Sequence, residues 1–153
     1  MKTEKIVVGT LTEEFLITHY DEFLYLEKEW KTLGDRPWTQ EKFFQGRQNK
    51  WELSSYASLD GNLVGYTIVS ADKEAYLHKI LVDSNHQNKG IGGLLLNETK
   101  RKCAEKGIKN LGFKVRTNGE PAIKFYKKFN TTFLEKDVAW DGIERYQCEL
   151  ILG

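Results

Sequence analysis

The chain is poor in the residues that build metal sites and disulfide frameworks. Its 153 residues include two cysteines, three histidines and two prolines. The cysteines, Cys103 and Cys148, lie far apart, and no Cys or His pair stands at the spacing of metal ligands. We therefore expect no metal, and we expect the two thiols to be reduced and buried.

Long hydrophobic runs and an excess of one charge are also missing. No apolar stretch reaches the roughly 18–20 residues that cross a bilayer. The first residues do not form the apolar region of a signal peptide. The formal net charge is +1, which argues against a dedicated nucleic-acid-binding protein. These absences predict a cytoplasmic protein with neither a membrane nor a nucleic acid as partner.

The charges are nevertheless divided unevenly along the chain. Residues 1–77 hold nine basic and thirteen acidic residues, whereas residues 78–153 hold fourteen basic and nine acidic ones. The basic half fits a polyanionic cofactor and the acidic half would suit a cationic partner, although solvated faces produce the same division. With 40% hydrophobic and 29% charged residues, the composition is that of one globular domain over residues 1–153.

The first part of the chain predicts two short strands and two helices. The strands are Ile6–Val8 and Glu14–Ile17, as in a hairpin. A helix is expected from Asp21 to Leu33, because apolar residues recur there on one face. Thr39 is suited to begin a second helix that continues toward Gln48.

The pattern then changes to period two, with Asp60-Gly61 as a strong hairpin turn. Later glycines and asparagines end or begin helices. The expected elements are strands at 52–59, 62–69 and 74–82, a helix at 91–106, a strand at 111–115, a helix at 118–129 and a hairpin at 133–152. This order predicts a mixed α/β (α+β) domain, with one mostly antiparallel central sheet flanked by about four helices.

A glycine-rich segment, Gln87-Asn88-Lys89-Gly90-Ile91-Gly92-Gly93, joins a predicted strand to a predicted helix. Such a junction binds anions, because glycines let backbone N–H groups approach a ligand and the helix dipole adds partial positive charge. A Walker loop does not fit, because Lys89 precedes Gly90. A dinucleotide fingerprint does not fit either, because Leu95 stands where its third glycine belongs.

Gln87-x-x-Gly90-x-Gly92 resembles the Gln/Arg-x-x-Gly-x-Gly/Ala signature of the GNAT superfamily, the Gcn5-related N-acetyltransferases. Residues 77–83 look like the family's fourth strand. Asn118 to Tyr126 looks like its Asn-x-x-Ala-x-x-Phe-Tyr segment. The resemblance covers residues 74–138 and is only topological before them. It implies the GNAT-like acyl-CoA acyltransferase fold.

The resemblance implies that acetyl-CoA donates an acetyl group directly to an amine acceptor. The glycine-rich segment would hold the pyrophosphate, and Asn118 would bond the pantetheine arm or the neighbouring loop. The strand edge at 80–82 would pair with the pantetheine amides, and an N–H there would polarise the thioester carbonyl. A bulge near Leu81 would open this edge. The implied cofactor-binding residues are Ile80, Leu81, Val82, Gln87, Asn88, Lys89, Gly90, Ile91, Gly92, Gly93, Asn118 and Tyr126.

Two residues are catalytic candidates. Tyr126 is suited to be the general acid, because a phenol of pKa near 10 stays protonated at neutral pH; its alternative is a core tyrosine. His78 is the preferred base, since some family members, including the arylalkylamine acetyltransferases, place a catalytic histidine on this strand. A hydrogen-bonded sheet histidine is the alternative, with Glu74, Glu41 or a water chain as the base. Strand alternation predicts that only one of His78 and Lys79 faces the cleft.

The acceptor side is predicted less sharply. Trp38 is a candidate for the pocket wall, while Glu27, Glu29 and Glu41 either attract an amine or are solvated. A small-molecule amine is the expected acceptor. A protein N-terminus or lysine, or a non-catalytic acyl-CoA-binding module, is the alternative. The oligomeric state stays open between monomer and homodimer. The basic residues of the helix at 91–106 are expected to form a solvated face rather than a nucleic-acid site: Lys100, Arg101, Lys102 and Lys106.

Overall fold

A seven-stranded sheet organises the computed structural model, which describes residues 5–30, 38–87 and 89–152. Its strand order is β1-β2-β3-β4-β5-β7-β6, and every described neighbour is antiparallel except the parallel pair β4–β5. The strands are β1 (Ile6–Thr10), β2 (Ser55–Leu59), β3 (Asn62–Ala71), β4 (Ala75–Val82), β5 (Asn110–Arg116), β6 (Thr132–Val138) and β7 (Glu144–Ile151). The predicted mixed, mostly antiparallel sheet is confirmed.

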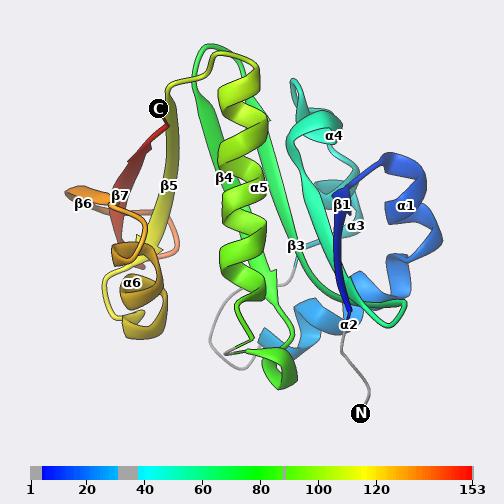
Figure 1. Cartoon of the computed structure of the whole chain (residues 1–153). Helices are drawn as coiled ribbons and strands as arrows, with labels where there is room; N and C mark the ends of the chain where they lie inside the picture. The colour runs from blue at the N-terminus through cyan, green and yellow to red at the C-terminus, as the bar shows by residue number, and fades with distance from the viewer. Residues whose placement is uncertain (1–4, 31–37, 88, 153) are drawn as a thin grey trace.

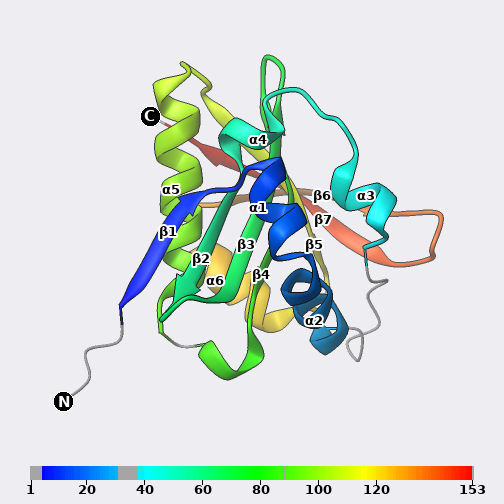
Figure 2. The same ribbon diagram turned by 90° about the vertical axis from the view of Figure 1, so that its right-hand side faces the viewer.

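Helices cover both faces of the sheet, as Figures 1 and 2 show. One face carries α5 and α6, and the other carries α1, α2 and α3. The helices are α1 (Glu13–Thr18), α2 (Tyr20–Trp30), α3 (Gln40–Phe44), α4 (Lys50–Leu53), α5 (Ile91–Glu105) and α6 (Glu120–Lys127). Four of them have six residues or more, in agreement with the expected number.

Local sequence explains most of these elements. In α2, Phe23 and Leu26 are buried, as helical spacing requires. The β2–β3 turn has positive φ at both Asp60 (51°) and Gly61 (85°), the backbone that matches the twist of a two-residue hairpin. Asn130 also has a positive φ, 57°, the left-handed conformation that asparagine adopts more readily than most residues other than glycine.

Two predicted strand segments are helical instead. Residues 14–17 belong to α1, because the Thr12 hydroxyl accepts a hydrogen bond from the Phe15 N–H at 3.0 Å and caps the helix. Residues 52 and 53 belong to the single turn α4. Both segments are shorter than the window over which helix and strand periods can be told apart. The predicted end of the helix at Leu33 lies outside the described residues.

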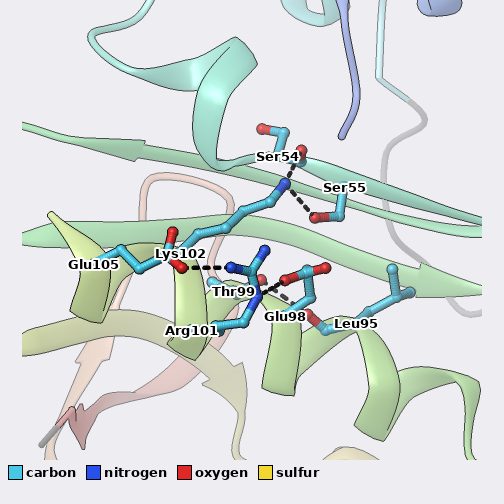
Figure 3. Close-up of polar contacts among 8 residues, drawn as sticks. All are labelled: Ser54, Ser55, Leu95, Glu98, Thr99, Arg101, Lys102 and Glu105. Carbon is cyan, nitrogen blue, oxygen red and sulfur yellow. Dashed lines mark hydrogen bonds and ion pairs between the residues drawn. The ribbon is translucent and has the colours of Figure 1, made fainter. Parts of the chain in front are cut away.

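Lys102 corrects the predicted solvated face of α5. Its side chain is buried, and its Nζ donates to the Ser54 carbonyl at 3.0 Å and the Ser55 hydroxyl at 2.8 Å, which ties α5 to the start of β2 (Figure 3). Arg101 is exposed and bridges Glu98 and Glu105 on the helix surface (Figure 3). The basic residues of α5 therefore do not form one continuous surface.

Candidate active site

Along more than half of its length, the edge of β4 that faces β5 does not pair with that strand. The two strands pair only at Ala75–Leu111 and Tyr76–Gly112, although β4 continues to Val82 and β5 to Arg116. Figure 1 shows the strands diverging from there toward the start of α5. Backbone groups of Ile80 and Leu81 on this edge therefore have no ladder partner in β5, as a pairing with an extended ligand requires.

A bulge in β4 lies at His78. Lys79 pairs with Ile68 and Leu77 pairs with Val69, so His78 has no partner of its own in β3. The expected bulge is present, but the prediction that placed it near Leu81 is wrong. A bulge depends on the register between two strands, which the sequence of one strand does not specify.

The bulge also overturns the prediction from strand alternation. The His78 Nε2 lies 2.7 Å from the Ser70 Oγ, and the Lys79 Nζ lies 2.6 Å from a carboxylate of α2. Ser70 and Ile68 stand two residues apart in β3 and share the face that carries α1–α3. His78 and Lys79 therefore both face this side, because the extra residue re-aims one of the two side chains.

His78 is a neutral, half-buried imidazole at neutral pH. Burial lowers its pKa to about 4, and the nearby positive charges of Arg47, Lys50 and Lys42 act in the same direction. Its ring also lies against Tyr76, with 4.9 Å between the ring centroids. A neutral imidazole has a free lone pair for a proton, but a pKa near 4 makes it a weaker base than the ordinary histidine that the sequence predicted.

Tyr126 stands on α6, beside the start of α5. Its ring packs on Phe113, with 4.3 Å between the ring centroids, and its side chain is buried in the core under α5 and α6. Burial raises its pKa well above the ordinary value, so the phenol stays protonated throughout the physiological range. This state suits a proton donor, while the packing also fits the alternative of a core tyrosine.

The glycine-rich segment forms the N-terminus of α5. Gly90 is the N-cap with a φ of 77°, which only glycine adopts readily. The first amide bonded within the helix is that of Leu94, which donates to the Gly90 carbonyl at 3.0 Å. The amides of residues 91–93 therefore point out of the helix end, where an anion is bound best.

Gly92 has a second reason to lack a side chain. A Cβ there would lie 3.1 Å from a ring carbon of Phe125, and one on Gly93 would lie 3.6 Å from Phe129. Gly92 therefore lets Phe125 of α6 pack closely against the first turn of α5, whereas a Cβ on Gly93 would make only an ordinary contact. Ile91 contributes only its amide to the helix end, because its side chain is buried in the core. Gln87 and Lys89 flank this end, and Asn88 lies outside the described residues.

Asn118 does not cap α6 as predicted. The N-cap is Gly119, and the side chain of Asn118 is exposed in the turn after β5. Three residues separate Asn118 from Ala122, whereas the family signature has two. The additional residue shifts Asn118 away from the helix start. Its expected bond to the pantetheine arm stays a prediction.

A carboxylate on the acceptor side is buried, although the sequence did not predict its burial. Glu27 of α2 is 3% exposed and accepts hydrogen bonds from the Tyr66 hydroxyl and, at 3.0 Å, from the Trp38 N–H. It also pairs with Lys79 at 2.6 Å. The alternative that Glu27 is solvated is therefore wrong, and its carboxylate is paired with a cation of the fold. Its position four residues after Phe23, on the buried face of α2, was the available signal.

The other acceptor-side candidates lie around α3. Trp38 is half-buried, and its ring centroid lies 5.5 Å from that of Phe43. The Lys79 Nζ lies 5.4 Å from the centroid of the Trp38 ring. Glu41 is exposed and borders an open hollow of about 560 Å³. Glu74 is exposed in the turn before β4. The side chain of Glu29 lies outside the described residues.

The described residues show neither a metal cluster nor a helix that could span a membrane. No three His, Cys, Asp or Glu side chains gather there as a metal site would require. Across residues 5–30, 38–87 and 89–152, no helix has the length and apolar character to cross a membrane.

Comparisons with known proteins agree with this geometry. The model of the acetyltransferase (GNAT) family matches residues 13–130. The ribosomal protein bS18-alanine N-acetyltransferase of Salmonella typhimurium is 28% identical over 104 residues, which cover 66% of this chain and 70% of that protein.

Two solved structures share the fold. The ribosomal-protein-S18-alanine N-acetyltransferase from Escherichia coli superposes with a TM-score of 0.81 at 19% identity, over 97% of this chain and 95% of that one. Naa50 of Arabidopsis thaliana, in complex with the bisubstrate analogue CoA-Ac-MVNAL, has a TM-score of 0.74 at 19% identity, over 94% and 97% of the two chains. The open β4 edge, the free helix end and the family match lead to one conclusion: the chain belongs to the GNAT acetyltransferase family and is an N-acetyltransferase that uses acetyl-CoA as its donor.

Proposed function

We propose that this enzyme acetylates the primary amine of a small molecule at the bulge of β4. The observation that carries the proposal is the position of the β4 edge at Ile80 and Leu81, which does not pair with β5, together with the free amides at the start of α5. On the acceptor side of the bulge, Lys79 is 17% exposed and Glu27 3%, so the Glu27 carboxylate is not open to an acceptor. A free primary amine is the first candidate, because it needs no contact beyond the bulge and the donor.

The donor would be held by backbone groups. The amides at the N-terminus of α5 bind the pyrophosphate, with Gln87 and Lys89 at its side. The edge of β4 pairs with the pantetheine amides, and an N–H of Ile80–Val82 stabilises the negative charge on the thioester oxygen. Such a donor is worth a few kcal/mol, because it is already oriented before the reaction starts.

Two side chains would move the protons. As the new C–N bond forms, the acceptor nitrogen becomes more acidic, which brings its pKa toward that of His78. Neutral His78 accepts that proton on its unprotonated ring nitrogen. Tyr126 gives its proton to the departing thiolate, and α6 holds it at the open end of the sheet. The high pKa of the phenol favours its return to the protonated form after each turnover.

A release assay tests the proposal. Acetyl-CoA is incubated with a panel of free primary amines, and free thiol is measured together with the mass of the product. We expect thiol release that depends on both enzyme and amine, with a mass increase of one acetyl group. Binding of acetyl-CoA without transfer to any amine or peptide would contradict the proposal and favour an acyl-CoA-binding module.

A second acceptor class is favoured by the relatives. The Salmonella protein is named for the alanine of ribosomal protein bS18, so the α-amino group of a protein is the second candidate. Peptides that begin with alanine belong in the same panel. A kcat/KM for such a peptide that is well above that of every free amine would replace the first candidate by the second.

A further inference from the structure

Three positive side chains stand in the segment from α3 to α4: Lys42 of α3, Arg47 of the following loop and Lys50 of α4. Their charges act on His78 in the same direction as burial, which is the largest cause of its low pKa. The loop is fixed beside the bulge, because the Gln48 carbonyl accepts from the Ala71 N–H at 3.0 Å. Ala71 directly follows Ser70, the hydrogen-bond partner of His78.

These three cations have no carboxylate partner among the described residues. Lys50 is buried and donates to the carbonyls of Phe43 and Gln45, the latter at 2.9 Å. Arg47 is half-buried and donates to the Gln45 side chain at 3.2 Å. The Lys42 Nζ lies over the Trp38 ring, 5.5 Å from its centroid.

Cations on the neighbouring strands, in contrast, do have carboxylate partners. Lys79, Lys114 and Arg145 are paired with Glu27, Asp137 and Asp141. The buried carboxylate of α2 is thus already neutralised by Lys79. Glu41 is exposed on α3, and Glu13 acts on Lys50 more weakly than burial and Arg47 do. Three cations without a carboxylate partner among the described residues therefore belong to the segment fixed beside the bulge, and the guanidinium of Arg47 has N–H donors for an anion besides the one that bonds Gln45.

We propose that the acceptor is a primary amine that carries a carboxylate, and that Arg47 binds this carboxylate and determines specificity. The proposal rests on the proposed function and names its substrate class. A planar guanidinium matches a carboxylate with two parallel hydrogen bonds, which orients the molecule as well as attracting it. The same positive surroundings disfavour an ammonium ion, so the amine loses its proton more easily once it is bound. A polyamine has the wrong charge for this space.

Matched acceptor pairs test the proposal. Each pair is a free amino acid and its amide, which differ only in the carboxylate, and spermidine is added as a polyamine. For the wild type we expect kcat/KM to be roughly tenfold or more higher for the acid than for the amide, the range of a charge-assisted hydrogen bond. Arg47→Gln should remove most of this preference by lowering the value for the acid, with less than about a twofold change for the amide.

Two further variants test whether the change in acid preference depends on the position of the charge that is removed. Lys42→Gln, on the exposed side of α3, should reduce the preference in the same direction but less. Arg101→Gln, on the outer surface of α5, should leave it unchanged. Urea denaturation establishes that each variant is folded.

The outcomes separate the two proposals. Amides or spermidine that react as fast as the acids would overturn the charge proposal and leave the N-acetylation of small amines in place. If Arg47→Gln lowers kcat/KM equally for the acid and the amide, Arg47 has a role in the fold rather than in binding the carboxylate. That result would also overturn the charge proposal. Failure of every amine and peptide in the panel, with acetyl-CoA bound, would refute the proposed function itself, and the charge proposal would fall with it.

Discussion

The buried pair of Glu27 and Lys79 offers the sharpest test of how the acceptor wall is held. Glu27→Gln keeps the shape of the side chain but removes the charge that Lys79 faces at 2.6 Å. Removing one partner of a buried ion pair costs about 3–5 kcal/mol, because the other charge is left without compensation. Lys79 is 17% exposed and regains some water, so we expect a loss of about 2–3 kcal/mol in the free energy of unfolding.

A double-mutant cycle isolates the pair itself. Glu27→Gln, Lys79→Met and the double variant are unfolded in urea, and the free energy and m value are fitted for each. The double variant should be more stable than the sum of the single losses predicts, with a coupling of about 1–2 kcal/mol. The single Glu27→Gln change should lower Tm by roughly 5–10 °C, as expected for a domain of this size.

The control is an ion pair on the outer surface of α5. Glu105 lies 2.6 Å from Arg101, and both side chains are exposed. Glu105→Gln should therefore leave stability unchanged within error. A coupling between Glu27 and Lys79 below about 0.5 kcal/mol, the usual limit of additivity, would refute the reasoning and assign Glu27 to its hydrogen bonds alone.

Four further variants address the site and its surroundings. Gly92→Val should abolish acetyl-CoA binding, measured by calorimetry; if a second change, Phe125→Leu, restores binding, packing rather than phosphate contact explains the glycine. Tyr126→Phe should lower kcat by roughly tenfold or more with little change in CoA affinity, and an unchanged kcat would remove it from the mechanism. His78→Ala should remove an acid limb near pH 4 from the profile of kcat/KM, whereas a limb at pH 6–7 that persists in the variant would assign the base elsewhere. Lys50 has a pKa of about 8 in the fold and near 10.5 when unfolded, so the unfolded chain binds more protons between these values and stability should rise there by about 1.4 kcal/mol per pH unit. Lys50→Met should lack this increase in urea titrations, and an unaltered slope would show that Lys50 is not its source.

Local patterns in the sequence predicted the parts of the fold that depend on neighbouring residues. The Asp60-Gly61 turn and the helix that begins at Gly90 follow from backbone preferences within a few residues, and both are present. The open edge of β4 was expected from the family resemblance, and its pairing with β5 does end after Tyr76. Short segments were predicted wrongly, because the three apolar residues within 14–17 satisfy both periods and the cap at Thr12 decides between them.

The parts of the site that the sequence did not predict depend on contacts between distant segments. The bulge at His78 results from the register with β3, and it brings two adjacent side chains to one face. Glu27 could be assigned to the buried face of α2 from its spacing, but its partners Tyr66 and Lys79 stand on β3 and β4. Periodicity indicates that a side chain is buried, while only the tertiary structure shows which charge it meets.

The charge of the acceptor side illustrates the same difference. The first half of the chain is acidic, with nine basic and thirteen acidic residues, and on that count it would suit a cationic partner. The structure directs its carboxylates elsewhere: Glu27 neutralises Lys79, and Glu22 pairs with His19 and accepts from the Leu63 N–H. Arg47 keeps its charge beside His78 without a carboxylate partner among the described residues. If the acceptor binds beside Arg47 as proposed, the potential that it meets is set by a few pairings within one Debye length, roughly 8–10 Å, and has the opposite sign to that of the half-chain.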